Sequence, residues 1–265
     1  MIFIPGLLLA QEEFSMDYKI LYEAEYSMDS TNLDNKNTEP LYLYSSSTHG
    51  VLMNYYEAHK EEIMADLQRQ LKTSGQINIQ KPISTNFSKV FYKDLASGKV
   101  QTLGKIDRKN YLYQEDQTPL KWNIEEGTKE IAGYAAQKAT THFSGRDYEA
   151  WFTMEIPIPD GPYVFAGLPG LIIELYDTED HYHFTMTSIE KLKEPKSIEL
   201  PKVIEIAKEK FEEVSAEVEK NKLHNMLEMG NVQIIRSGSG EKMDRQTFKR
   251  QIQEKNARKN NPIER

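Results

Sequence analysis

A two-residue alternation of apolar and polar side chains constrains this chain more than any other feature. Apolar residues take every second position over residues 18–26, from Tyr18 through Tyr22 to Tyr26, and charged residues such as Glu23 stand between them. Neighbouring side chains of a β-strand point to opposite faces of the sheet, so this spacing predicts a half-buried antiparallel strand.

Further short apolar segments, each bounded by polar, Gly or Pro residues, continue this pattern along the chain. They lie at residues 41–44, 51–55, 90–92, 100–103, 111–113, 121–124, 137–143, 148–156, 171–176, 182–189 and 232–235. Their close spacing predicts antiparallel hairpins and not parallel strands joined by helices. The predicted fold is mainly β (α+β): a strongly curved antiparallel meander sheet or half-barrel with an inserted helix and a C-terminal helical region.

Two segments have helical and not strand periodicity. In residues 58–71, Ile63, Leu67 and Leu71 are spaced four apart amid charged residues. Four-residue spacing puts them on one face of a helix inserted between the early strands. A second helix is predicted at about 201–228, with Pro201 in its first turn.

Composition excludes several classes of function. The 265-residue chain has a formal net charge of -8, which argues against a nucleic-acid-binding surface because phosphate binding depends on clustered Lys and Arg. There is no Cys, so disulfides, thiolate metal sites and cysteine nucleophiles are excluded. No segment approaches the roughly 20 apolar residues of a membrane-spanning helix, so no transmembrane segment is expected.

The two ends of the chain differ from the rest. Residues 1–10 are uncharged and mostly apolar and end in Ala10, which is typical of a signal-peptide remnant, although the basic residues that usually precede such a run are missing. Residues 11–236 are predicted to form a single β-rich domain that includes the helix at about 201–228. Residues 237–265 begin with Ser and Gly and are rich in Lys and Arg, which predicts a flexible basic tail.

The densest cluster of turn residues precedes the strand at 171–176. It contains Gly167, Leu168, Pro169 and Gly170, followed by Leu171 and Ile172. Proline fixes its own φ, and glycine adopts backbone angles closed to other residues, so a structural corner is favoured, with Gly170 needing an unusual conformation. A ligand-binding loop is the alternative, although the helix and spacing of a phosphate loop are missing.

The hexapeptide Gly167-Leu-Pro-Gly-Leu-Ile172 resembles the sequence that names the GLPGLI family of Bacteroidetes. Other segments resemble that family's motifs in the expected order: Trp122-Asn-Ile124, Ile131-Ala-Gly133-Tyr134, Gln137-Lys138-Ala139, Gly145-Arg146, Ala150-Trp151-Phe152-Thr153, Glu155-Ile156-Pro157, Asp160-Gly161-Pro162 and, near the end, Asn261-Pro262-Ile263-Glu264. The resemblance covers residues 16–189 well. Ala135-Ala136 stands where family members often have Cys, which puts a thiol-based role in doubt here.

The resemblance implies an exported protein, periplasmic or otherwise in the cell envelope, without established enzymatic chemistry. Its implied partner is an outer-membrane protein. A curved sheet could also hold an apolar small-molecule ligand on its concave side, with an amphipathic helix against it. No cofactor is expected, and the alternative function is a metal-dependent or other hydrolase whose site the sequence does not reveal.

Three residues are candidates for ligand binding. The guanidinium of Arg146 matches carboxylate and phosphate groups, although an ion pair that steadies a local turn, near Asp147 and Glu149, is favoured. Trp151 and Tyr134 could stack on a ligand, but burial in the core is the commoner use of large rings. A binding role for these residues is therefore the less favoured interpretation.

His181 and His183 form the one arrangement with metal-ligand spacing. Residues two apart on a strand share a face, so two imidazoles could hold one ion with oxygens from Glu179 and Asp180. Two histidines rarely suffice alone, and a third such as His142 would have to come near through folding. The spacing of His181 and His183 thus allows a metal site, but the sequence does not favour one.

Overall fold

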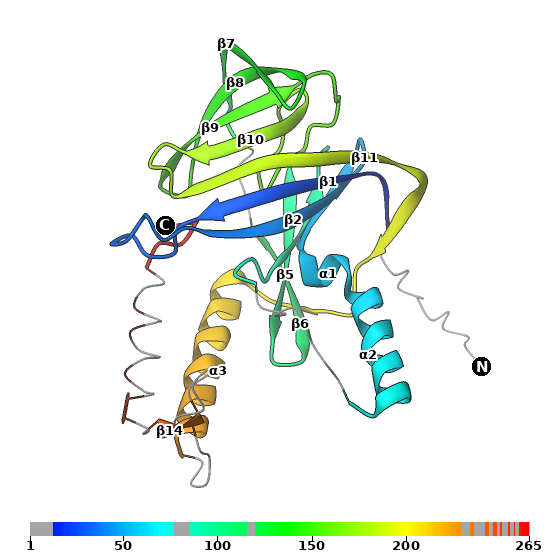
Figure 1. Ribbon diagram of the computed structural model, residues 1–265. Coiled ribbons are helices and arrows are strands. Elements are labelled where there is room, and N and C mark those ends of the chain that lie inside the picture. Colours follow the sequence, from blue (N-terminus) through cyan, green and yellow to red (C-terminus); the bar gives the residue numbers. More distant parts are fainter. Residues whose placement is uncertain are drawn as a thin grey trace, which may run out of the picture.

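The computed structural model (Figure 1) describes residues 13–76, 85–115, 120–228, 234–235, 242–243, 246–247, 250, 254, 257 and 260–264. The strands are β1 (Glu13–Tyr26), β2 (Asn37–Ser45), β3 (His49–Asn54), β4 (Val90–Asp94), β5 (Lys99–Ile106), β6 (Lys109–Glu115), β7 (Asn123–Ile131), β8 (Tyr134–Phe143), β9 (Arg146–Thr153), β10 (Leu171–Asp177), β11 (Tyr182–Glu199), β12 (Ile204–Glu205), β13 (Ile234–Ile235) and β14 (Lys242–Met243). The helices are α1 (Tyr55–Ala58), α2 (Lys60–Ser74) and α3 (Lys208–Glu228). The predicted signal remnant at 1–10 lies outside the described residues.

Twelve strands form one sheet in the order β12-β6-β5-β4-β3-β2-β1-β11-β10-β9-β8-β7. The chain runs outward from β1 to β6, crosses to the far edge at β7, and returns through β8, β9 and β10 to pair β11 with β1. Every pairing in this sheet is antiparallel except that of β12 with β6, so the predicted mainly β, antiparallel fold is confirmed. In Figure 1 the β7–β10 part lies above β1 and β11, and β5 and β6 run below them.

The main core lies between the two halves of the curved sheet. One face of β1, including Ile20, Tyr22 and Ala24, packs in the same cluster as Leu43 of β2 and Phe152 of β9. Burial of these side chains provides the main driving force for closing the halves toward each other. A second cluster covers the opposite face of β2–β5, and it begins on β1 with Phe14 and Met16.

A β-bulge explains how one strand serves both clusters. The pairing of β1 with β11 shifts between Met16 and Tyr18. Met16 pairs with Lys196 and Tyr18 with Lys191, so four residues of β11 face one residue of β1 in this gap. Such an interruption of the ladder bends a strand and increases its twist. Phe14 and Met16 before it pack in the second cluster, and Ile20 after it packs in the main core. Residues 13–17 therefore extend β1 beyond the predicted strand, and β11 continues to Glu199 because it pairs with this extension.

Two predictions about helices need correction. The segment from Pro201 begins not with helix but with β12, which pairs in parallel with β6, and α3 starts only at Lys208. The helix packs through Phe211 against the β5–β6 edge and does not cover the inner face of the sheet.

None of the helices in the described part of the chain has the length and apolar character needed to cross a membrane.

The inner face is covered instead by the long loop between β9 and β10, residues 154–170. Its Tyr163, Phe165 and Leu168 are buried in the main core. The last described residues also pack there and are not part of a free tail: Asn261 is 4% exposed and Ile263 contacts the main cluster. The prediction of a flexible tail is thus wrong for residues 260–264.

Candidate functional site

A buried ion pair fixes the loop at residues 154–170 to the first half of the sheet. The Lys93 ammonium of β4 contacts the Asp160 carboxylate, and the side chains are 1% and 0% exposed. Lys93 Nζ also donates to the Gly161 carbonyl at 2.6 Å, and Ser45 Oγ donates to Asp160 Oδ2 at 2.7 Å. Because each charge is paired and hydrogen-bonded, the fold can bury both.

Residues around the Lys93–Asp160 pair leave space for it and respond to its charge. A Cβ at Gly50 would lie 2.0 Å from Asp160 Oδ2, so only glycine leaves room for the carboxylate. Burial lowers the pKa of Lys93, although the charge of Asp160 opposes that change. Burial also raises the pKa of Tyr22 well above its ordinary value, and the negative charge of Asp160 adds to the increase.

The glycines of the corner act by two different mechanisms. Gly167 has φ of +93°, the left-handed region that favours glycine, and nothing lies within 4 Å of the position its Cβ would take. Gly170 does not have a positive φ; a Cβ there would lie 2.1 Å from the Thr153 carbonyl oxygen. The expectation of an unusual backbone angle is therefore correct for Gly167 and wrong for Gly170, which is required by close backbone approach.

The other residues of the hexapeptide lie in the core or in the bend that leads to it. Leu168, Leu171 and Ile172 are at most 1% exposed and pack in the main core. Pro169 lies in the bend between them, directly before the buried Gly170. The hexapeptide therefore forms the end of the loop and the start of β10.

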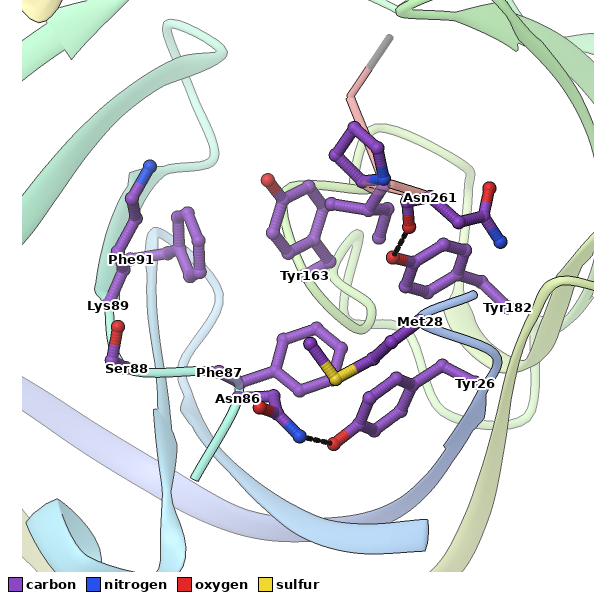
Figure 2. Close-up of a pocket in the computed structure, with 12 residues that line it drawn as sticks. Tyr26, Met28, Asn86, Phe87, Ser88, Lys89, Phe91, Tyr163, Tyr182 and Asn261 are labelled. Atoms are coloured by element: carbon purple, nitrogen blue, oxygen red, sulfur yellow. Dashed lines mark hydrogen bonds between the residues drawn. The ribbon is translucent and has the colours of Figure 1, made fainter. Parts of the chain in front are cut away.

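A ring-lined pocket of about 290 Å³ opens at the side of the main core. Figure 2 shows Tyr26, Phe87, Phe91, Tyr163 and Tyr182 arranged around it. The full lining consists of Tyr26, Met28, Asn86, Phe87, Ser88, Lys89, Phe91, Tyr163, Tyr182, Asn261, Pro262 and Ile263. These residues come from the end of β1 and the turn after it, from β4 and the segment leading into it, from the loop at 154–170, from β11 and from the C-terminal end.

Hydrogen bonds hold the pocket's aromatic walls in place. The Tyr182 hydroxyl donates to the Asn261 carbonyl at 2.6 Å, and the Tyr26 hydroxyl donates to Glu39 at 2.8 Å (Figure 2 shows the first). Phe87 and Tyr26 rings meet edge to face with centroids 5.2 Å apart. Burial is the main reason that the pKa of Tyr26 is raised above its ordinary value.

The C-terminal wall of the pocket is attached through Asn261. Its Nδ2 donates to the Ser27 carbonyl at 2.7 Å, and its backbone N–H donates to the Met28 carbonyl at 3.1 Å. The Arg146 guanidinium donates to Asn261 Oδ1 at 2.5 Å and to the Pro262 carbonyl at 2.9 Å. The end of the chain is thus bound to the body of the domain by side-chain and backbone contacts.

Arg146 lies at the centre of a buried cluster and does not face a ligand pocket. It is 3% exposed, and Nη1 donates to Asp177 Oδ2 at 2.7 Å and to His181 Nδ1 at 3.0 Å. The sequence favoured an ion pair for Arg146, and the structure shows one. Its partner is Asp177, 31 residues later in the chain, and not Asp147 or Glu149. The guanidinium also lies 5.2 Å from the Tyr182 ring centroid, which links this cluster to the pocket wall.

The two candidate stacking residues lie away from the pocket. Trp151 is 9% exposed, its Nε1 donates to Glu149 at 3.0 Å, and the Lys129 ammonium lies 4.1 Å from a ring centroid. Tyr134 is partly buried against the main core at the start of β8. Arg146, Trp151 and Tyr134 are therefore not brought together in one site.

The two candidate metal ligands bond to different partners. His181 faces Arg146, while His183 Nε2 lies 3.1 Å from Glu174 on the neighbouring strand. Of the described residues, Asp177, Glu179 and His181 do bring ligand atoms within 4.8 Å of one another. Arginine has only donors, so the Nδ1 atom that it faces must accept, and the guanidinium supplies the positive charge there. His142 is not part of this group, and its Nδ1 pairs with Asp147 at 2.7 Å.

The sequence patterns did not point to the pocket. Phe87, Lys89 and Tyr163 lie at strand borders or in a loop, where no periodicity marks a buried face. The resemblance of residues 261–264 to a recurring family terminus was the available signal that this segment has a fixed place.

Comparison with known proteins identifies the family of this chain. A family model described as "N-glycanase peptide, N-terminal domain" matches residues 42–212, which is more than half of the chain. No curated protein sequence matches. Solved structures of PNGF-II in the P21 and C2 space groups are similar in fold, with TM-scores of 0.55 and 0.54 and 14% identity, covering 77% of this chain. The chain spans about a third (34% and 33%) of the length of those proteins. The chain therefore belongs to the family described as the N-glycanase N-terminal domain.

Proposed function

We propose that this chain is a non-catalytic binding domain that takes a small apolar molecule into the ring-lined pocket. The observation that supports the proposal is the pocket itself. Its volume of about 290 Å³ lies near the lower end of the range for small-molecule sites, and rings and aliphatic groups form most of its lining. Transfer of an apolar ligand from water to such a surface is favourable.

The rigidity of the walls also supports binding. Tyr163 belongs to the loop held by the Lys93–Asp160 pair, and Asn261 is held by Arg146. A site whose walls are fixed before binding loses little conformational entropy when the ligand enters. The arrangement therefore favours a preformed pocket over one assembled by the ligand.

The cellular setting is part of the same proposal. The apolar start of the chain and the resemblance to the GLPGLI family support an exported, cell-envelope protein that acts with an outer-membrane partner. Fractionation of cells that produce the natural precursor, with mass spectrometry of the mature N-terminus, tests this. Recovery of the unprocessed chain from the cytoplasm would contradict it.

A hydrolase is the competing function, and the word N-glycanase in the family description gives it a specific basis. Within the described residues, Asp177, Glu179 and His181 are the group that could hold a catalytic metal. The Arg146 guanidinium occupies their centre with bonds of 2.7 Å and 3.0 Å to Asp177 and His181. Binding in the pocket therefore has more support than metal-assisted hydrolysis at this cluster.

Binding of the neutral fluorescent molecule N-phenyl-1-naphthylamine tests the proposal. We expect saturable binding by the wild type and its loss in Met28→Trp, because the larger ring would fill part of the pocket that Met28 lines. Met154→Trp is the matched control, since Met154 is 62% exposed and is not among the lining residues. Equal binding by both variants, with unchanged melting temperatures, would rule out this pocket as the site.

A further inference from the structure

Lys89 is the one charged residue among the twelve that line the pocket. It lies directly before β4, and Figure 2 shows its side chain at the pocket edge beside Phe91. Its ammonium lies 5.4 Å from the Tyr113 ring centroid and 6.0 Å from that of Phe211. These ring contacts favour a cation at this edge.

The nearby acidic group is already neutralised by another lysine. Glu264 accepts a hydrogen bond from Lys208 at 2.7 Å and another from the Tyr163 hydroxyl. Burial alone would raise the pKa of Glu264, but these bonds and the charges of Lys208 and Lys89 outweigh it and lower the pKa. Two cations therefore face one carboxylate at this end of the pocket.

A second carboxylate, Glu39, bonds to residues of the pocket wall but is not part of the lining. It accepts hydrogen bonds from the Tyr26 hydroxyl at 2.8 Å and the Asn86 backbone N–H at 3.1 Å, and another from Thr85. Among the described residues, Lys89 forms no salt bridge with a carboxylate, and Glu264, on which its charge acts, is bonded by Lys208.

We propose that the pocket selects small aromatic anions: a planar ring system that carries a carboxylate, sulfonate or phosphate group. The ring would lie among Phe87, Phe91 and Tyr163, where offset and edge-to-face contacts are favourable. The anionic group would pair with Lys89 at the edge, where partial exclusion of water strengthens the attraction. This inference rests on the proposed binding function and adds the charge and shape of the ligand.

Two dyes of nearly the same shape separate the charge from the ring. They are 8-anilinonaphthalene-1-sulfonate, which is anionic, and neutral N-phenyl-1-naphthylamine. We expect the wild type to bind the anion at least about tenfold more tightly, equivalent to about 1.4 kcal/mol. The preference should decrease as salt is added, because salt screens the charge of a partly exposed lysine.

Variants of Lys89 assign the preference to one residue. Lys89→Met should abolish it while binding of the neutral dye persists, and Lys89→Arg should keep it. Lys196→Met is the control, because Lys196 also lies over a ring, 4.4 Å from the Tyr44 centroid, but outside the pocket. If Lys89→Met fails to fold, the wild-type preference and its retention in Lys89→Arg decide the question.

The outcomes distinguish the two proposals. Equal affinity of the wild type for both dyes, or a preference that persists in Lys89→Met, would overturn the anion inference and leave the binding function intact. Failure of both dyes to bind a folded wild type would overturn both. A preference for the anion that Met28→Trp does not reduce would place the anion elsewhere and also overturn the inference.

Discussion

Arg146, the first residue of β9, donates to the Asn261 side chain 115 residues later in the chain, at 2.5 Å. This bond lies in the interior, where both residues are nearly inaccessible to water. It attaches the end of the chain to the same cluster that holds Asp177 and His181. One guanidinium thus stabilises both the β10–β11 turn and the C-terminal wall of the pocket.

Loss of the Asn261 side chain should loosen this wall. We expect Asn261→Ala to lower the free energy of unfolding by about 1–3 kcal/mol, because the Ser27 carbonyl and Arg146 lose their partner. Asn260→Ala is the control: Asn260 is exposed and bonds only Ser30 among described residues, so a change within about 0.5 kcal/mol is expected. Urea denaturation measures both, and equal losses would contradict the proposed attachment.

Breaking the Lys93–Asp160 pair should be costly. Lys93→Met leaves a carboxylate without its cation in the core, and we expect a loss of about 3–5 kcal/mol in the free energy of unfolding. The double variant Lys93→Met/Asp160→Asn should lose less than the two single variants together, since their losses share one interaction. Lys210→Met, at an exposed pair with Glu213 at 2.8 Å, should cost less than about 1 kcal/mol. Additive losses would show that the buried charges act independently.

The two corner glycines should respond differently to alanine. Gly170→Ala forces a methyl group against the Thr153 backbone, which cannot yield as a side chain can, so a loss of about 3 kcal/mol or more is expected. In Gly167→Ala the added methyl group meets no atom, so the loss in unfolding free energy comes only from the φ of +93° and should be about 1–2 kcal/mol. Thermal and urea unfolding compare them. A larger loss at Gly167 would show that backbone angle outweighs close approach here.

Acid should remove a contribution from Glu174. Its hydrogen bond with His183, together with Lys129 at 2.5 Å, lowers the pKa of this carboxyl from 4.5 to about 2, although burial opposes the change. Because the folded-state pKa is the lower one, the stabilisation is present above pH 4.5 and is lost as the pH falls toward 2. Partial exposure to solvent weakens it, so about 1–2 kcal/mol is expected.

The variant Glu174→Gln isolates that contribution. Its deficit in unfolding free energy relative to the wild type should be present near neutral pH and should shrink as the pH falls through this range. Glu213→Gln, at the exposed pair with Lys210, controls for removal of a surface charge. A deficit that does not change with pH would mean that Glu174 stabilises by packing alone.

Zinc should not stabilise the protein. Asp177, Glu179 and His181 have suitable atoms, but His181 Nδ1 accepts from Arg146 at 3.0 Å and the guanidinium already offsets one of the two negative charges. We expect equal melting temperatures with excess zinc chloride and with a chelator. A rise in melting temperature that His181→Ala abolishes and His183→Ala does not would identify these three residues as a metal site.

Local sequence was sufficient to identify most elements of this fold. Alternation over residues 18–26 predicted the C-terminal part of β1, and four-residue spacing of Ile63, Leu67 and Leu71 predicted α2. The glycines and proline before Leu171 predicted the corner that ends the loop. These features depend on neighbouring residues and on backbone geometry, so they can be recognised without knowing any distant partner.

Edges and extensions of the sheet could not be recognised in this way. β7 continues to Ile131 although its exposed side chains show no apolar alternation, because pairing with β8 determines its length. The polar end of β11 is a strand because residues 13–16 of β1 lie beside it. A ladder of backbone hydrogen bonds can order a segment whose own side chains give no signal.

The candidate site was decided entirely by tertiary structure. Lys93 meets Asp160, Arg146 meets Asn261, and Lys89 stands at a pocket whose walls come from well-separated parts of the chain. Sequence by itself determined which residues were available and where most of the strands lie. The strand order, the bulge after Met16 and the crossing to β7 decided which of them meet, because contacts between distant residues depend on register and burial, which local periodicity does not encode.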